Sequence, residues 1–124
     1  MKTVNLVVRI LLGLLLLMTG FNKFFMFMPM PEMVDPAQQF MMALVNTGYI
    51  MPIVAIVEIV TALLIIFNKY QALALVILFP IMLNAFLFHL FLDIDGIGGS
   101  LVAIVFNIYL LFVNKDRFGE LLNA

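Results

Sequence analysis

The side chains that could carry chemistry in this chain lie inside strongly apolar segments. Glu58 is the clearest case, because nine uncharged residues precede it (Tyr49–Val57) and nine follow it (Ile59–Phe67). A charged group at the centre of a bilayer costs about 2.5–3.5 kcal/mol on insertion scales. Glu58 is therefore expected to be neutral, to pair with a cation, or to face a polar cavity. An acid in such a position accepts a proton or a hydrogen bond, which makes it a candidate functional residue.

Arg9 and Asn107 are expected to lie at a depth similar to that of Glu58. With a rise of about 1.5 Å per residue, Arg9 lies about 8 Å, Glu58 about 13 Å and Asn107 about 9 Å from the inner ends of their segments. Since an arginine side chain can bridge the difference, the sequence predicts that the three residues meet in one polar layer. That layer is either a clamp that fixes helix register or a binding site in which Glu58 contacts a ligand head group. A third possibility is that Arg9 snorkels to the interface and Glu58 stays protonated.

Two more polar residues, His89 and Asn84, occur in the third apolar segment. His89 precedes Asp93 by one helical turn and is expected near the level of Lys23, at the outer end. A lone membrane histidine is either a hydrogen-bonded bundle residue or a proton carrier or quinone donor. Asn84 follows Pro80 by four residues, so it is expected to satisfy backbone carbonyls that the proline leaves free.

Composition places the whole chain in a membrane. Of its 124 residues 66% are hydrophobic and 10% are charged, with a mean hydropathy of +1.25, whereas soluble domains are roughly 45–50% apolar and 25% charged. The net charge of −1 gives no basic face for nucleic acid. The absence of cysteine excludes disulfides, iron–sulfur clusters and thiolate zinc sites, and a single histidine excludes bis-histidine haem ligation in one copy.

Four apolar segments are long enough to cross a bilayer of about 30 Å. They cover residues 4–24, 49–67, 71–92 and 97–113. Short connections predict an all-α, antiparallel four-helix membrane bundle that forms a single transmembrane domain over residues 1–124. Small or polar residues share one face of three segments, at Arg9, Gly13 and Gly20, at Ala55, Glu58 and Ala62, and at Ser100, Ala103 and Asn107.

The basic residues predict the orientation. Lysine and arginine gather on the cytoplasmic side of membrane proteins. Only Lys23 falls on one side of the predicted bundle, and the other five fall on the opposite side: Lys2, Arg9, Lys69, Lys115 and Arg117. Both termini are therefore expected to be cytoplasmic.

The first outer loop is expected to contain a short amphipathic helix. Asp35-Pro36 is typical of a helix start, and apolar residues recur at helical spacing between Ala37 and Val45. Such a helix lies on the membrane surface or folds over the bundle mouth. It is either a hydrophobic lid with a packing role only or a gate over a lipid-facing pocket.

Several short motifs in their order along the chain resemble the DoxX family of small bacterial four-helix membrane proteins. They are Arg9-Ile10-Leu11-Leu12-Gly13, Gly20-Phe21-Asn22-Lys23, Glu58-Ile59 and the late His89. The family is named for a subunit of an archaeal quinol oxidase, and relatives belong to thiosulfate:quinone oxidoreductases. The resemblance implies a multi-pass accessory protein of the bacterial inner membrane, linked to redox or quinone metabolism, with Arg9, Lys23, Glu58 and His89 at the family's polar positions.

These observations predict a quinone- or lipid-binding subunit in which Glu58 and His89 contact a polar head group. The alternative is a structural or assembly partner of a membrane complex, whose polar layer is a clamp without a ligand. A small transporter or proton pathway is a third hypothesis, and it would require an oligomer, because four short helices rarely enclose a pore. The chain has no independent redox centre, so catalysis by it alone is not expected. Expected partners are the lipid bilayer, a membrane or cytoplasmic redox protein, and a second copy of the chain.

Overall fold

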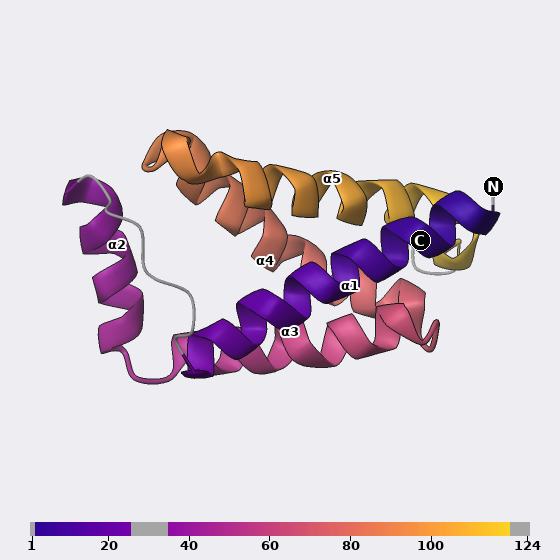
Figure 1. Ribbon diagram of the computed structural model, residues 1–124, viewed down its shortest axis with the longest axis horizontal. Coiled ribbons are helices and arrows are strands. Elements are labelled where there is room, and N and C mark those ends of the chain that lie inside the picture. The colour runs from indigo at the N-terminus through magenta and orange to yellow at the C-terminus, as the bar shows by residue number, and fades with distance from the viewer. Residues whose placement is uncertain (1, 26–34, 120–124) are drawn as a thin grey trace.

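Every regular element in the described residues, 2–25 and 35–119, of this computed structural model is helical. Four long helices form an antiparallel bundle (Figure 1). A shorter helix, α2 (Asp35–Asn46), lies across one end, and two single 3₁₀ turns are η1 (Ile94–Gly96) and η2 (Lys115–Phe118). The long helices are α1 (Lys2–Phe25), α3 (Ile50–Ile66), α4 (Gln71–Phe91) and α5 (Ile97–Val113). The predicted all-α bundle is confirmed.

The long helices have the length and composition of membrane spans. Three stretches qualify by themselves: α1, α4, and α5 together with η1. Helix α3 has 17 residues and joins α2 at a bend of 87°. Because α3 packs along α1 and α4, it crosses the membrane with them. The ends of the four long helices lie within two residues of the ends of the predicted segments.

Two glycines bring α1 and α3 into close contact. A Cβ atom at Gly20 would lie 3.2 Å from the carbonyl oxygen of Ala55 and 2.8 Å from Cγ1 of Ile59. Gly13 packs in the same way against Ile66, the last residue of α3. With 3.6 residues per turn, the eleven residues of α1 before Gly13, residues 2–12, therefore extend about three turns past the end of α3.

The packed core occupies only one half of the bundle. We call the end where α1 begins and α5 ends the terminal end, and the end where α2 lies the opposite end (Figure 1). No described residue is buried in α1 beyond Gly20, in α4 beyond Met82, or in α5 before Ala103. Helices α1, α4 and α5 are therefore loosely packed at the opposite end, where α3 still has the buried residue Ala55. The core consists of Leu12, Leu16, Ala62, Ile65, Ala74, Leu75, Leu78, Met82, Ala103, Ile104 and Leu110.

Helix α2 bridges two of the long helices at this open end. It begins at Asp35, where the Asp-Pro pair predicts a helix start. Ala37 is fully buried, α2 contacts α3, and the ring of Phe40 stacks on Phe88 of α4 with 5.4 Å between the centroids. The predicted helix in this connection is confirmed. Its role as a gate stays a prediction.

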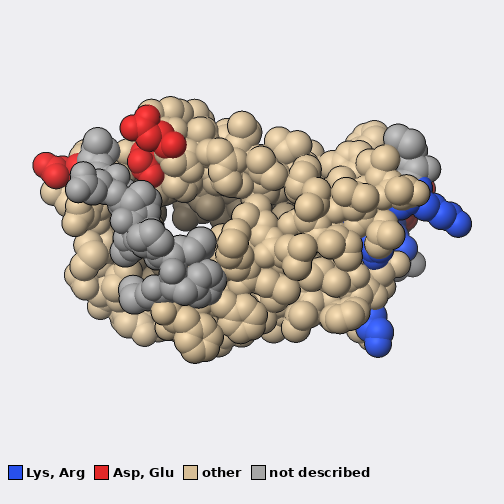
Figure 2. All heavy atoms as spheres, in the orientation of Figure 1, with Lys and Arg blue, Asp and Glu red and all other residues tan. Residues whose placement is uncertain are grey.

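Charge is segregated between the two ends. On the face shown in Figure 2, lysine and arginine atoms gather at the terminal end and acidic atoms at the opposite end. Between them the surface is formed by uncharged residues, as a lipid environment requires.

Candidate functional site

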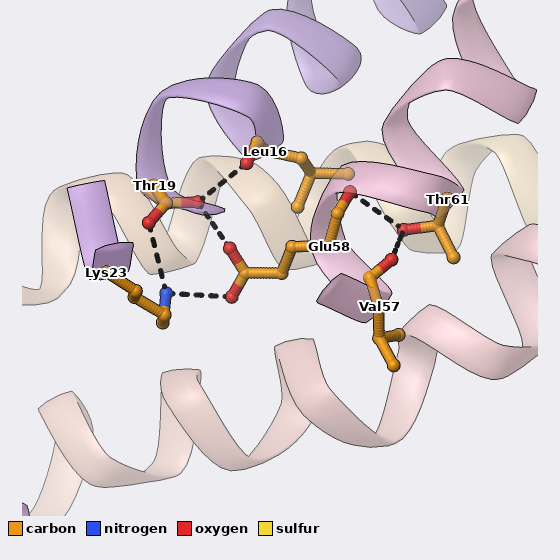
Figure 3. A network of polar contacts seen from close by, with 6 residues as sticks. All are labelled: Leu16, Thr19, Lys23, Val57, Glu58 and Thr61. Atoms are coloured by element: carbon orange, nitrogen blue, oxygen red, sulfur yellow. Dashed lines mark hydrogen bonds and ion pairs between the residues drawn. The ribbon is translucent and has the colours of Figure 1, made fainter. Parts of the chain in front are cut away.

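Glu58 forms an ion pair inside the bundle, close to the middle of α3. The residue is 3% exposed. Its Oε1 atom accepts a hydrogen bond from Nζ of Lys23 at 2.9 Å, and its Oε2 atom accepts one from Oγ1 of Thr19 at 2.6 Å (Figure 3). Both carboxylate oxygens therefore have donors from α1.

The α-helical repeat explains why α1 supplies both donors. Thr19 and Lys23 are four residues apart, so they share one face of the helix. Gly20 lies between them and allows α3 to approach, which brings the Cβ atom of Glu58 near the α1 backbone. Lys23 lies in the last turn of α1, where the helix dipole favours a cation. Its Nζ atom also lies 3.5 Å from the carbonyl oxygen of Thr19.

The two members of the pair differ in accessibility. The side chain of Lys23 is 20% exposed and that of Glu58 is 4% exposed. An ammonium group has three N–H donors, and two of those of Lys23 are used within α1 and α3. Lys23 lies beyond Gly20, where α1 has no buried residue. It can therefore donate a hydrogen bond to an oxygen of another molecule, while Glu58 holds the ammonium in place.

The predicted layer of Arg9, Glu58 and Asn107 is wrong. Arg9 lies ten residues before Thr19, about 15 Å along α1, and it lines a cavity at the terminal end instead. The depth estimate took the inner ends of the two helices as level. Because α1 extends about three turns past the end of α3, Glu58 meets Thr19 and Lys23, and Arg9 lies beside the turn that joins α3 to α4.

Asn107 connects α5 to α4. It is fully buried, and its Nδ2 atom donates to the carbonyl oxygen of Leu75 at 3.4 Å. Its Oδ1 atom is buried without a hydrogen-bond partner among the described residues. Asn107 is therefore a contact between the last two helices and not a partner of Glu58.

His89 lies beside Asp93, one turn further along the chain. Its Nδ1 atom is 3.3 Å from Oδ2 and 3.3 Å from the main-chain oxygen of Asp93. Gly96 leaves room for this contact, since a Cβ atom there would lie 2.7 Å from Oδ2 of Asp93 and 3.0 Å from Nδ1 of His89. His89 follows Met82 by two helical turns, so it continues the bundle-facing side of α4 into the loosely packed end.

Asn84 does not make the predicted contact. Asn84 is exposed, and it makes no hydrogen bond within residues 2–25 and 35–119. The expected bond to the carbonyls around Pro80 is therefore absent. Asn84 follows the core residue Leu78 by six positions, which places it on the outward face of α4.

Sequence reasoning missed Thr19 as a partner of Glu58. The available signal was its spacing of four residues from Lys23, next to Gly20. No three histidine, aspartate or glutamate side chains in the described part lie close enough to share a metal ion.

One of the comparisons with known proteins finds a match, to a protein family. No curated protein and no solved structure matches the chain. A model of the DoxX family matches residues 4–90, more than two thirds of the chain. The matched stretch contains Thr19, Lys23, Glu58 and His89. The chain therefore belongs to the DoxX family.

Proposed function

We propose that the protein is an accessory subunit of the bacterial inner membrane that binds a quinone or a lipid through Lys23. The observation that carries this proposal is the partly exposed Lys23 ammonium, held by the buried Glu58 carboxylate at 2.9 Å. A fixed donor in an apolar setting suits a ligand with an apolar body and a few polar atoms. Quinone carbonyls and lipid ester oxygens are acceptors of this kind.

The roles of the polar residues follow from the hydrogen-bonding atoms that each still has available for a ligand. Both oxygens of Glu58 are engaged, so Glu58 orients Lys23 and does not itself contact the ligand. His89, on the other side of the loosely packed end, uses Nδ1 toward Asp93. Its Nε2 atom has no hydrogen bond within the described residues and is a second ligand contact.

The position of α2 supports the proposal that this helix is a gate at the opposite end. It crosses the open end of the bundle and touches α4 through Phe40 and Phe88. A surface helix with few contacts can move away at low cost. We propose that α2 opens to admit a ligand from the lipid.

The charge distribution supports an orientation with both termini in the cytoplasm. Lysine and arginine gather at the terminal end (Figure 2), as the positive-inside rule requires of a cytoplasmic face. The ligand site then lies toward the outer leaflet. On this proposal residues 1–124 form one DoxX-like domain that works with a membrane or cytoplasmic redox protein, or with further copies of itself.

A second candidate is a structural partner in which the ion pair clamps α1 to α3 without a ligand. The observation that favours it is that both Glu58 oxygens already have donors within the chain. Such a clamp fixes helix register by its hydrogen bonds alone.

Mass spectrometry of the gently solubilised protein separates the two candidates. The ligand proposal expects a quinone or one lipid species at near one copy per chain, reduced about tenfold or more in Lys23→Gln by loss of a charge-assisted hydrogen bond. Lys69→Gln is the matched control, since Lys69 is an exposed lysine in the α3–α4 turn. If Lys23→Gln retains as much ligand as Lys69→Gln but unfolds more easily, the clamp is correct and the ligand proposal fails.

A further inference from the structure

A second polar site lies at the terminal end, about 15 Å along α1 from the Glu58 ion pair. A cavity of about 610 Å³ opens there between the first turns of α1, the α3–α4 turn and the residues after α5. Lys2, Arg9 and Arg117 are its basic lining residues, and Asp116 is its acidic one. Three cations against one anion leave an excess of two positive charges, so the cavity attracts anions.

The cations of this cavity, Lys2, Arg9 and Arg117, form no ion pair with any group among residues 2–25 and 35–119. The Nη1 atom of Arg9 is buried and has no hydrogen-bond acceptor there. Buried donors nearly always have an acceptor, so this nitrogen points to a ligand oxygen.

Amide side chains build a fixed wall rich in donors. Nδ2 of Asn114 donates to Oε1 of Gln71 at 2.9 Å, and Nε2 of Gln71 donates to Oδ1 of Asn68 at 2.6 Å. Oδ1 of Asn5 accepts the hydroxyl of Tyr109 at 2.7 Å. The amide oxygens of Asn5, Asn68 and Gln71 thus each accept one hydrogen bond, and Asn5 and Asn68 also have N–H donors available to the cavity.

We infer that this cavity binds a phosphate group, either on the head of an anionic phospholipid or as a free anion. The phosphodiester of a lipid has only acceptor oxygens and one negative charge, and inorganic phosphate has mainly acceptor oxygens and one or two negative charges. Both match the free donors and the charge excess. Arginine binds it with two parallel hydrogen bonds. The cavity lies at the ends of the spans, at the level of lipid head groups, where basic pockets between helices bind such lipids. The inference is independent of the quinone or lipid site, which lies at the opposite end.

Native mass spectrometry of the full chain in neutral detergent tests whether the cavity binds a phosphate group. We expect a phosphatidylglycerol to bind about tenfold more tightly than a phosphatidylcholine of the same chains, and Arg9→Gln to remove about tenfold of that affinity, the loss of one charge-assisted pair. The control is Lys69→Gln, a charge removed at the same end from a residue that does not line the cavity. It should change the affinity less than about twofold, as expected for an exposed charge.

A second arm uses inorganic phosphate in calorimetry and as a competitor. Direct binding of phosphate that displaces phosphatidylglycerol assigns the site to free phosphate, and phosphatidylglycerol binding that survives excess phosphate assigns it to the lipid. Equal affinity for the two lipids without phosphate binding overturns the inference, as does an equal effect of Arg9→Gln and Lys69→Gln. If Arg9→Gln does not fold, the pair Lys2→Gln and Arg117→Gln, near the two chain ends, replaces it with the same expected result.

Discussion

Lys23 near the end of α1 and Glu58 in the middle of α3 are joined by an ion pair of 2.9 Å inside the membrane-spanning part of the bundle. The pair spans the contact between α1 and α3 that Gly13 and Gly20 make possible. It connects α1 to α3 toward the loosely packed end, beyond most of the apolar core. Its loss should therefore affect the stability of that end directly.

A double-mutant cycle on the pair should show strong coupling. Lys23→Met leaves the buried Glu58 carboxylate without its partner, at a cost of roughly 3–5 kcal/mol. Glu58→Gln leaves the partly exposed Lys23 ammonium unpaired, at a smaller cost. The double variant should be destabilised by less than the sum, because no uncompensated charge remains. The measurement is helix loss by circular dichroism in a detergent unfolding titration.

The matched control for this cycle is Lys69→Met, which removes an exposed lysine. It should change the free energy of unfolding by less than about 0.5 kcal/mol. Additive effects of Glu58→Gln and Lys23→Met would contradict the ion pair.

Thr19→Val should destabilise the bundle by about 1.5–3 kcal/mol, the range for hydrogen bonds to charged groups. Valine keeps the shape of threonine but removes the donor 2.6 Å from Oε2 of Glu58. Thr19→Ser restores the hydroxyl and should recover most of the loss in the same unfolding titration. A valine variant as stable as the wild type would show that this donor contributes nothing.

Gly20→Ala should destabilise the protein, whereas Gly99→Ala should not. At Gly20 the new methyl group would lie 3.2 Å from a backbone oxygen of α3, so the helices must separate. At Gly99 no atom lies within 4 Å, and alanine gains up to about 1 kcal/mol of helix propensity. Thermal melting of both variants in one detergent gives the comparison, and equal melting temperatures would refute the tight α1–α3 contact.

Asn107→Leu should be nearly neutral, and Asn114→Leu should be costly. Asn107 has a buried oxygen without a partner in the described residues and one long hydrogen bond of 3.4 Å. Leucine removes that polar atom and keeps the number and branching of the side-chain heavy atoms, so we expect a change below about 1 kcal/mol. Asn114 donates at 2.9 Å and 2.7 Å, and its replacement leaves Oε1 of Gln71 without a donor, which costs about 1–3 kcal/mol. The same titration measures both, and the reverse order would contradict these contacts.

A cross-link between α2 and α4 should slow ligand exchange if α2 is a gate. The chain has no cysteine, so Phe40→Cys with Phe88→Cys introduces a unique pair where the two rings stack. Oxidation should link it faster than the control pair Met42→Cys with Phe88→Cys, since Met42 is exposed two positions further along α2. Exchange of the bound quinone or lipid is then followed by mass spectrometry before and after reduction. An exchange rate that does not respond to the link would leave α2 as a packing element only.

The sequence by itself determined the helical bundle and the requirement that Glu58 has a partner inside the membrane. Hydrophobic length fixes the spans, and Asp35-Pro36 marks where α2 begins, because both signals are local. The cost of a charge in lipid requires a partner for Glu58 wherever the helices lie. These statements need no knowledge of which residues of different helices are level.

Tertiary structure decided which cation that partner is. Arg9 and Lys23 both lie on α1, fourteen residues apart. The depths estimated from the sequence favoured Arg9 and placed Lys23 at the outer end near His89. The choice depends on how far α1 slides along α3, which is set by Gly13 packing against Ile66 and Gly20 against Ala55. An axial offset of about three turns, or roughly 16 Å, moves Arg9 out of reach of the carboxylate and places Lys23 beside it. Such an offset is a property of side-chain packing between helices and is not encoded in the apolar periodicity of either one.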